Sequence, residues 1–242
     1  MEFQINLKNI LIINYFFGDN RVPTGRMVSD VCEEFKKKNI KFNIFYSSQK
    51  YKNLKSKSVK KKNEVRSLSF SNFKFINYII FLLSLIFHIY KNNYKKYLIL
   101  TDPPLIIIIS PIIKFLKPKS EVIYWTMDLY PEALYASKIF PFRNKIIFNY
   151  LKKIKNYSLK FVDKMINLGI SQNKLFQNYP NTKKILIKIV HPWDLRNFKN
   201  DNKSINKFLK KYNFLNKKII LYAGNIGVAH SIKTLINFIN FC

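Results

Sequence analysis

Residues 8–15 have the sequence KNILIINY, a short and continuously apolar run. Such a run is typical of a strand that is buried on both faces of a parallel sheet. Residues 40–46, IKFNIFY, predict a second strand. Between the two, apolar side chains recur at helical spacing and predict one buried helix face. They are Met27, Val28, Val31, Cys32 and Phe35. The stretch therefore predicts a βαβ unit, which implies a parallel sheet with a right-handed crossover.

The alternation of strand and helix continues along the chain. Further strands are expected over residues 65–70, 97–101, 121–126, 163–168 and 185–190, and helices over residues 105–116 and 144–161. Thr24 is expected to cap the first helix. The fold class is thus α/β, with a Rossmann-like parallel sheet and helices on both faces over residues 1–193.

A second domain is expected after this sheet. Residues 194–217 are polar and predict a linker with a short helix. Residues 218–222, KIILY, predict a buried strand that opens another Rossmann-like domain, followed by a helix from residue 231. One strand and one helix cannot bury their own apolar faces, so the domain over residues 218–242 is expected to be incomplete.

The charge balance of the 242 residues is strongly basic. Lys and Arg number 43 against 13 Asp and Glu, which gives a net charge of +30. Such a surface attracts nucleic acid, anionic membranes or phosphorylated substrates, although an AT-rich genome would explain part of the lysine excess. Helix-turn-helix, RNP and zinc-binding patterns are missing from the sequence, so no specific nucleic-acid partner is expected. The two cysteines, Cys32 and Cys242, suggest no disulfide framework, and a reducing cytosol fits best.

Two neighbouring segments have unusual compositions. Residues 49–66 are polar and very basic, and they predict a surface loop. Residues 75–90 are strongly apolar, but at about 16 residues they fall short of the roughly 20 that a membrane span needs. Five polar residues in and beside this segment share one helical face. They are Lys74, Asn77, Ser84, His88 and Lys91. The pattern predicts an amphipathic helix that packs in the core, lies in a membrane interface, or does both.

Unusual residues follow several predicted strands, where ligands bind in open α/β sheets. Gly25 begins the first helix, whose N-terminus would favour an anion, although a plain βα turn is the more usual reason for a lone glycine there. Asp128 and Glu132 follow another strand and suit acid–base work or the orientation of a substrate hydroxyl. Alternatively, Asp128 caps the next segment and Glu132 is solvated. Neither a G-x-G-x-x-G motif nor a Walker A motif is present in the sequence, so a dinucleotide or ATP site is unsupported.

A glycine turn follows the strand expected at residues 218–222. Backbone N–H groups of Gly224, Asn225 and Gly227 could hold a diphosphate there. His230 lies three residues further on, and a purely structural role is its alternative.

The order of these pieces resembles family 4 glycosyltransferases of the GT-B fold, especially bacterial enzymes of surface polysaccharide assembly. Four motifs carry the resemblance over nearly the whole chain. They are Pro23-Thr24-Gly25, Thr101-Asp102-Pro103-Pro104, Trp125-Thr126-Met127-Asp128-Leu129-Tyr130-Pro131-Glu132, and Tyr222-Ala223-Gly224-Asn225-Ile226-Gly227 with His230.

The resemblance implies a retaining transfer of a sugar from a nucleotide-diphosphate sugar to a membrane-associated acceptor, often a polyprenyl-diphosphate-linked sugar, with no cofactor and no obligatory metal. Asp128 would be catalytic. The acceptor domain would supply substrate-binding residues, and the glycine turn would line the diphosphate site. These residues are Thr24, Gly25, Asp102 and Glu132 in the first group and Gly224, Asn225, Gly227 and His230 in the second.

The resemblance also implies a cytoplasmic protein that is peripheral on the inner face of the cytoplasmic membrane. The basic loop and the apolar helix would then provide the membrane-facing residues. These are Lys57, Lys60, Lys61, Lys62, Phe81 and Phe87.

The chain departs from the family in its second domain, which family members usually have complete. A truncation, a split gene product or a degraded copy is therefore expected, which binds donor poorly and is inactive alone. The alternatives are a non-catalytic membrane-surface remnant, one chain of a split glycosyltransferase that works with a separate C-terminal half, and a basic nucleic-acid-binding protein.

Overall fold

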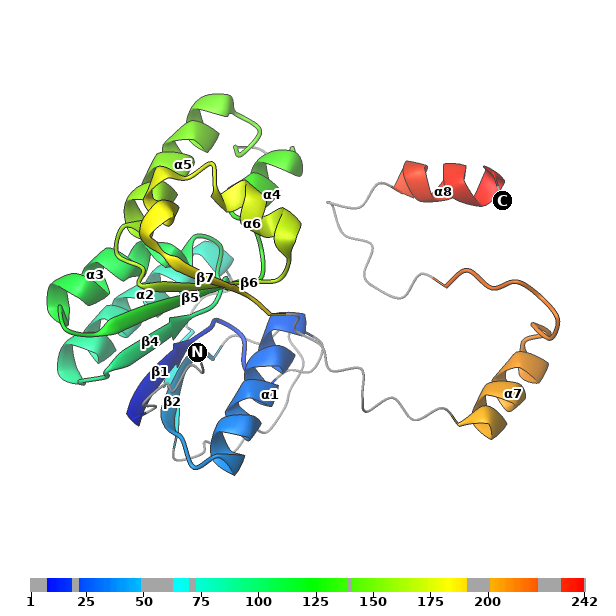
Figure 1. Ribbon diagram of the computed structural model, residues 1–242, viewed down its shortest axis with the longest axis horizontal. Coiled ribbons are helices and arrows are strands. Elements are labelled where there is room, and N and C mark those ends of the chain that lie inside the picture. The colour runs from blue at the N-terminus through cyan, green and yellow to red at the C-terminus, as the bar shows by residue number, and fades with distance from the viewer. Residues whose placement is uncertain are drawn as a thin grey trace. The chain divides into compact units, whose positions relative to one another are not determined.

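The computed structural model (Figure 1) describes residues 8–18, 22–48, 63–69, 73–138, 141–190, 201–221 and 232–241. The chain divides into two units, residues 1–191 and residues 192–242, and each is described by itself.

Within its described residues, the first unit forms one sheet of seven parallel strands. They are β1 (Lys8–Ile13), β2 (Lys41–Ser47), β3 (Glu64–Ser67), β4 (Lys96–Ile99), β5 (Glu121–Thr126), β6 (Lys164–Asn167) and β7 (Leu186–Ile189). Across the sheet the order is β3-β2-β1-β4-β5-β6-β7. The chain therefore adds β2 and β3 on one side of β1. It then crosses back to place β4 on the other side of β1, and β5, β6 and β7 follow in order beyond β4.

Helices connect the strands and cover both faces of the sheet. They are α1 (Pro23–Lys37), α2 (Lys74–Lys91), η2 (Ile106–Ile108), α3 (Ile109–Leu116), α4 (Glu132–Ala136), α5 (Lys145–Leu159), α6 (Ile170–Phe176) and η3 (Pro180–Lys184). In Figure 1, α1 lies on one side of the sheet, and α3 and α5 lie on the other. The fold is thus a Rossmann-like α/β arrangement, as the sequence predicted.

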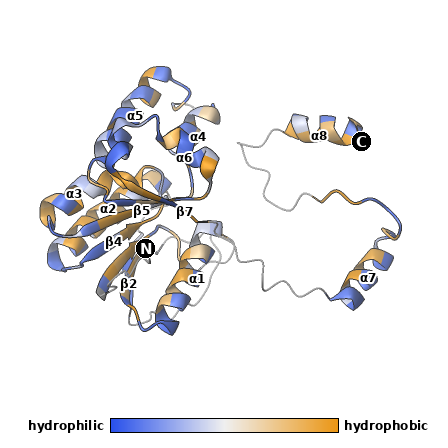
Figure 2. Ribbon diagram, viewed as in Figure 1, coloured by the Kyte–Doolittle hydropathy of each residue, from blue (hydrophilic) through white to orange (hydrophobic). Residues whose placement is uncertain are grey.

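The core consists of two apolar layers, one on each face of the sheet. Side chains alternate between them with the two-residue period of a strand. Ile10 and Ile12 of β1 pack in the layer under α1, whereas Leu11 and Ile13 pack in the layer under α2, α3 and α5. Both layers need apolar side chains, which explains why the strands read as continuous apolar runs and are mostly orange in Figure 2.

Most of the predicted elements are confirmed with small shifts of their ends. The apolar face of α1 lies inward: Met27, Val28 and Cys32 are buried, and Val31 and Phe35 pack against them. The strand expected at residues 65–70 is β3, which ends at residue 67.

Two details near the start of the chain were predicted wrongly. Thr24 does not cap α1, because the helix begins at Pro23 with Val22 as its cap, and the Thr24 hydroxyl donates to Asp102 instead. The basic loop ends earlier than expected, because residues 64–66 pair with β2 as part of β3. The lysines expected to face a membrane, Lys57, Lys60, Lys61 and Lys62, lie outside the described residues.

The helix expected at residues 75–90 is present as α2, and it is oriented differently from the expectation. Phe81 is fully buried against the sheet, so its predicted place on a membrane-facing surface is wrong. Asn77, on the polar face, is buried too, and Phe87 is exposed as expected. Packing on the sheet selects the face with Asn77, Phe81, Leu85 and Ile89, which follow one another at four-residue intervals.

The second unit contains two described helices, α7 (Asn202–Lys211) and α8 (Ile232–Phe241). The short helix expected in the linker is confirmed as α7. The strand predicted at residues 218–222 is not formed over residues 218–221, and Leu221 is 81% exposed there. An apolar run needs neighbouring strands to pair with, and the described part of this unit offers none.

The two faces of α2 should respond differently to truncation. We expect Phe81→Ala to lower the free energy of unfolding by about 3–5 kcal/mol, because it leaves a cavity against the sheet. Phe87→Ala, on the exposed face, should change it by less than about 1 kcal/mol. Urea unfolding followed by circular dichroism measures both, and equal losses would contradict the orientation of α2.

Candidate functional site

The reversal of strand order between β1 and β4 creates a natural ligand site. The segment after β1 leads away to β2 on one side, and the segment after β4 leads to β5 on the other. Open α/β sheets bind ligands in the crevice that such a reversal leaves at the carboxyl ends of the strands. Three of the four motifs singled out in the sequence lie at this edge: the start of α1, the turn after β4 and the turn after β5.

Asp102 joins the first two of these motifs. Its backbone carbonyl accepts a hydrogen bond of 3.0 Å from the N–H of Tyr15, just after β1. Its carboxylate accepts a hydrogen bond from the hydroxyl of Thr24 in the first turn of α1. Thr24 and the adjacent Gly25 are both buried. The start of α1 is therefore held against the end of β4.

Asp128 connects the third motif, the turn after β5, to the segment after β4. It lies two residues beyond β5, and its backbone N–H donates to Oγ1 of Thr101 at 3.2 Å. Thr101 directly precedes Asp102, and the charge of Asp128 acts on the Asp102 carboxyl. Asp102 is partly buried whereas Asp128 is exposed, so Asp128 is the member of the pair that a ligand can reach.

The protonation of both carboxyls is perturbed. Burial raises the pKa of Asp102, the Thr24 hydroxyl opposes this, and the charge of Asp128 adds to it. Protein atoms that displace water from one side of Asp128 raise the pKa of its carboxyl as well. Tyr130 lies in the same turn, and burial together with the charges of the two aspartates raises its pKa to about 12. Carboxyls with raised pKa values in a crevice are typical of groups that take up or release protons.

Further polar side chains near this edge were missed in the sequence. Asn14 directly follows β1 and is fully buried, and among the described residues its Oδ1 has no hydrogen-bond partner. Thr126, at the end of β5, donates to Oδ1 of Asn167 at 2.5 Å at the end of β6. The sequence could have indicated these residues, because each is a polar residue at the end of an apolar strand. Such residues are unusual in a core that is otherwise filled with Ile, Leu and aromatic side chains.

Glu132 lies apart from the aspartate pair. Its carboxylate pairs with Nζ of Lys155 at 3.0 Å and accepts a hydrogen bond from the hydroxyl of Tyr179. Burial alone would raise the pKa of Glu132, but Lys155 and Tyr179 outweigh burial and hold it below its ordinary value. The group connects α4 with α5 and η3, and so fixes the end of the turn that holds Asp128. A substrate-binding role for Glu132 remains a prediction.

Lys155 is unusually enclosed for a lysine. Its side chain is 1% exposed, and its Nζ lies 4.6 Å from the ring centre of Phe176 and 4.4 Å from that of Tyr179. Burial lowers its pKa, and the charge of Glu132 works against this. The faces of the two rings and one carboxylate thus replace the water that a buried ammonium group loses.

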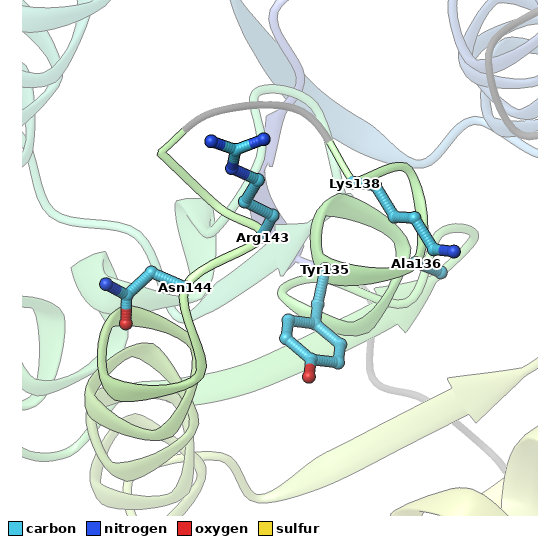
Figure 3. A pocket seen from close by; sticks show the side chains of 5 residues that line it. All are labelled: Tyr135, Ala136, Lys138, Arg143 and Asn144. Carbon is cyan, nitrogen blue, oxygen red and sulfur yellow. The ribbon is translucent and has the colours of Figure 1, made fainter.

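A basic pocket lies between α4 and α5, away from the aspartates. Figure 3 shows its lining residues, Tyr135, Ala136, Lys138, Arg143 and Asn144. The Asn144 side chain already accepts a hydrogen bond from the N–H of Ile146 at 2.8 Å, where it caps α5. Its described lining residues include two cations but no acid or nucleophile, so these side chains suit the binding of an anion.

The remaining predicted site residues cannot be placed in this site. The four residues of the expected diphosphate turn, Gly224, Asn225, Gly227 and His230, lie outside the described residues. Over the residues that are described, His, Cys, Asp and Glu side chains form no group of three suited to a metal ion.

No known family model matches the chain, and a search of curated proteins gives no significant match. The function therefore has to be inferred from the site itself.

We expect Asp102→Asn to stabilise the folded chain at neutral pH. The amide still accepts from Thr24, but it removes a charge that the fold disfavours. The pKa of Asp102 is higher in the folded state than its unfolded value of about 3.9. The folded state therefore loses stability as the pH rises from the unfolded pKa to the folded pKa, because the carboxyl ionises more readily in the unfolded chain. The difference in the free energy of unfolding between Asp102→Asn and wild type should be smallest at a pH below the unfolded pKa of Asp102, and it should increase as the pH rises.

Urea unfolding across a pH series measures this gain. Asp30→Asn, at an exposed position of the same helix α1, controls for the loss of one negative charge. A gain equal to that of the control, or a loss at neutral pH, would contradict the assignment.

Removal of the enclosed cation should be costly. Lys155→Met leaves the partly buried carboxylate of Glu132 without its ammonium partner, and we expect it to lower the free energy of unfolding by about 3 kcal/mol. Lys153→Met, at an exposed position of α5, should have little effect. The double variant with Glu132→Gln should lose less than the sum of its single variants, and additive losses would show that the pair is not coupled.

Proposed function

We propose that the chain provides the acceptor-binding domain of a retaining glycosyltransferase with the GT-B architecture, of the family 4 type. The donor is a nucleotide-diphosphate sugar, and the acceptor is a lipid-linked, polyprenyl-diphosphate type of sugar used in surface polysaccharide synthesis. The proposal is supported above all by one observation. The segments around Thr24, Asp102 and Asp128, far apart in the chain, are joined by hydrogen bonds at the reversal of strand order.

Each of these residues suits a part of glycosyl transfer. The first turn of α1 presents backbone N–H groups to an anion, and a glycine there allows close approach. Asp102 holds Thr24 and so fixes the position of that turn. Asp128 is reachable and has a raised pKa, which suits a carboxylate that orients an acceptor hydroxyl or exchanges a proton with it.

The charge of the chain is consistent with such substrates. Both the donor and the acceptor contain diphosphate groups, and the net charge is +30. The donor side of the proposal depends on residues 224–230 and on further donor-site residues that the first domain does not supply. Sugar, nucleotide and acceptor sugar are left open.

The proposal is tested by transfer of a labelled sugar from UDP-sugars to a polyprenyl-diphosphate-linked sugar. We expect measurable turnover when a C-terminal nucleotide-sugar-binding half is supplied as a second chain. In the complemented enzyme, Asp128→Asn should lower kcat by about 10²–10⁴-fold with a smaller effect on KM for the acceptor.

The control is Asp30→Asn, which removes the same charge from an exposed position of α1. Unchanged kcat in Asp128→Asn would remove the catalytic role of Asp128. A direct titration of the chain with a short-chain polyprenyl-diphosphate sugar needs no second half, and failure to bind it would contradict the acceptor-binding role.

A further inference from the structure

Helix α2 is apolar on two opposite faces. One face packs on the sheet, where Phe81, Leu85 and Ile89 are fully buried. The other face is open to solvent although most of its side chains are large and apolar. Its members are Phe75, Ile76, Ile79, Leu83, Phe87 and Tyr90, which are 42–71% exposed. A surface helix of a globular protein usually places polar residues there, so this second face needs a partner.

The packing of α2 decides how a membrane could contact it. By length and composition, α2 could cross a bilayer. A spanning helix is surrounded by lipid or by other spanning elements, whereas α2 contacts β2, β3 and α3 of the first unit. While this packing holds, α2 can meet a bilayer only with its long axis in the plane of the surface.

The charged residues of α2 and α3 have one sign. Residues 74–91 and 109–116 contain no Asp or Glu. Lys74 and Lys91 mark the two ends of α2, and Nζ of Lys91 lies 4.3 Å from the ring centre of Phe87. Nζ of Lys117 donates to the backbone carbonyl of Tyr90 at 3.2 Å, which places another cation at the C-terminal end of α2.

The apolar surface extends beyond α2. Helix α3 contacts α2, and its Phe115 is 85% exposed. Lysine side chains can keep their ammonium groups in water while their stems lie along such a surface. The combination of an apolar strip with cations at its ends matches an anionic bilayer, where acyl chains cover the strip and headgroup phosphates meet the lysines.

A second copy of the chain matches this face less well. A twofold contact would bring the same helices together and place lysines near lysines. Neither α2 nor α3 offers a carboxylate to pair with them. The phosphates of anionic lipids provide the negative charge that a contact between two copies of the chain would lack.

We propose that the exposed face of α2, together with Phe115, docks in the plane of an anionic membrane surface. The inserted side chains enter the boundary between headgroups and acyl chains, about 5–10 Å deep. The inference deepens the lipid-linked part of the proposed function and rests on it for its biological meaning. Its test uses no sugar or nucleotide, so its failure would leave the transfer proposal standing.

The test is flotation of the full chain with vesicles of phosphatidylcholine and phosphatidylglycerol, and with vesicles of phosphatidylcholine alone. We expect wild type to float with the anionic vesicles. The double variant Leu83→Ser, Phe87→Ser should bind them at least about tenfold more weakly. The matched control is Ile146→Ser, Tyr150→Ser, which removes two apolar side chains from α5 that are at least as exposed, and it should bind like wild type.

A second variant keeps the apolar face intact. Phe87→Trp should bind like wild type, and lipids brominated near the headgroup should quench its added fluorescence more strongly than lipids brominated near the chain ends. Circular dichroism and the melting temperature confirm that each variant is folded.

Several results would overturn the proposal. Equal binding by the α2 and α5 variants would show that general positive charge alone attracts the chain. Resistance to extraction at alkaline pH would indicate a spanning helix. A wild-type chain that ignores vesicles but forms a dimer that Leu83→Ser, Phe87→Ser dissociates would identify a second copy as the partner.

Discussion

The pairing of β1 with β4 is the constraint on which the site depends. These strands are neighbours in the sheet although the chain visits β2, β3 and α2 between them. Parallel strands cannot be joined by a tight turn, so the chain leaves β1 on one side and β4 on the other. The segments that follow these two strands therefore lead in opposite directions across the sheet. Asp102, just past β4, joins the two segments through hydrogen bonds from Tyr15 and Thr24.

Elements buried on both sides were the easiest to predict from the sequence. β1 is an apolar run because two core layers need its side chains, and α1 has one apolar stripe because it meets one face. Phe81 and Phe87 looked equivalent, since only contact with the sheet selects which apolar face of α2 is buried. Thr24 resembled a cap until its distant partner Asp102 was known. Residues 218–221 do not form the strand that was predicted there, because the composition of a segment cannot supply the neighbouring strands that it needs.

The segments after β4 and β5 contain carboxyls whose ionisation is disfavoured and one whose ionisation is favoured. Asp102 and Asp128 are held where their ionisation is opposed, which is an arrangement that folding alone would not select. Close by, Glu132 is held in its ionised form by Lys155 and Tyr179. This ion pair fixes the end of the turn between β5 and α4, so the position of Asp128 depends on a stabilised carboxylate four residues away in sequence. The sequence shows that carboxylates follow these strands, but it does not show which of them has an ion-pair partner.

Helix α2 and the candidate site are joined through a direct contact. The hydroxyl of Tyr78, in the first turns of α2, donates to the backbone carbonyl of Pro104 at 2.7 Å. Pro104 belongs to the same turn as Asp102. α2 begins where β3 ends, so its first turns and the aspartates lie at the same carboxyl edge of the sheet. A bilayer that covers Phe75 and Ile76 would therefore lie beside the crevice. An acceptor whose lipid tail stays in that bilayer would reach Asp128 with its head group without leaving the membrane.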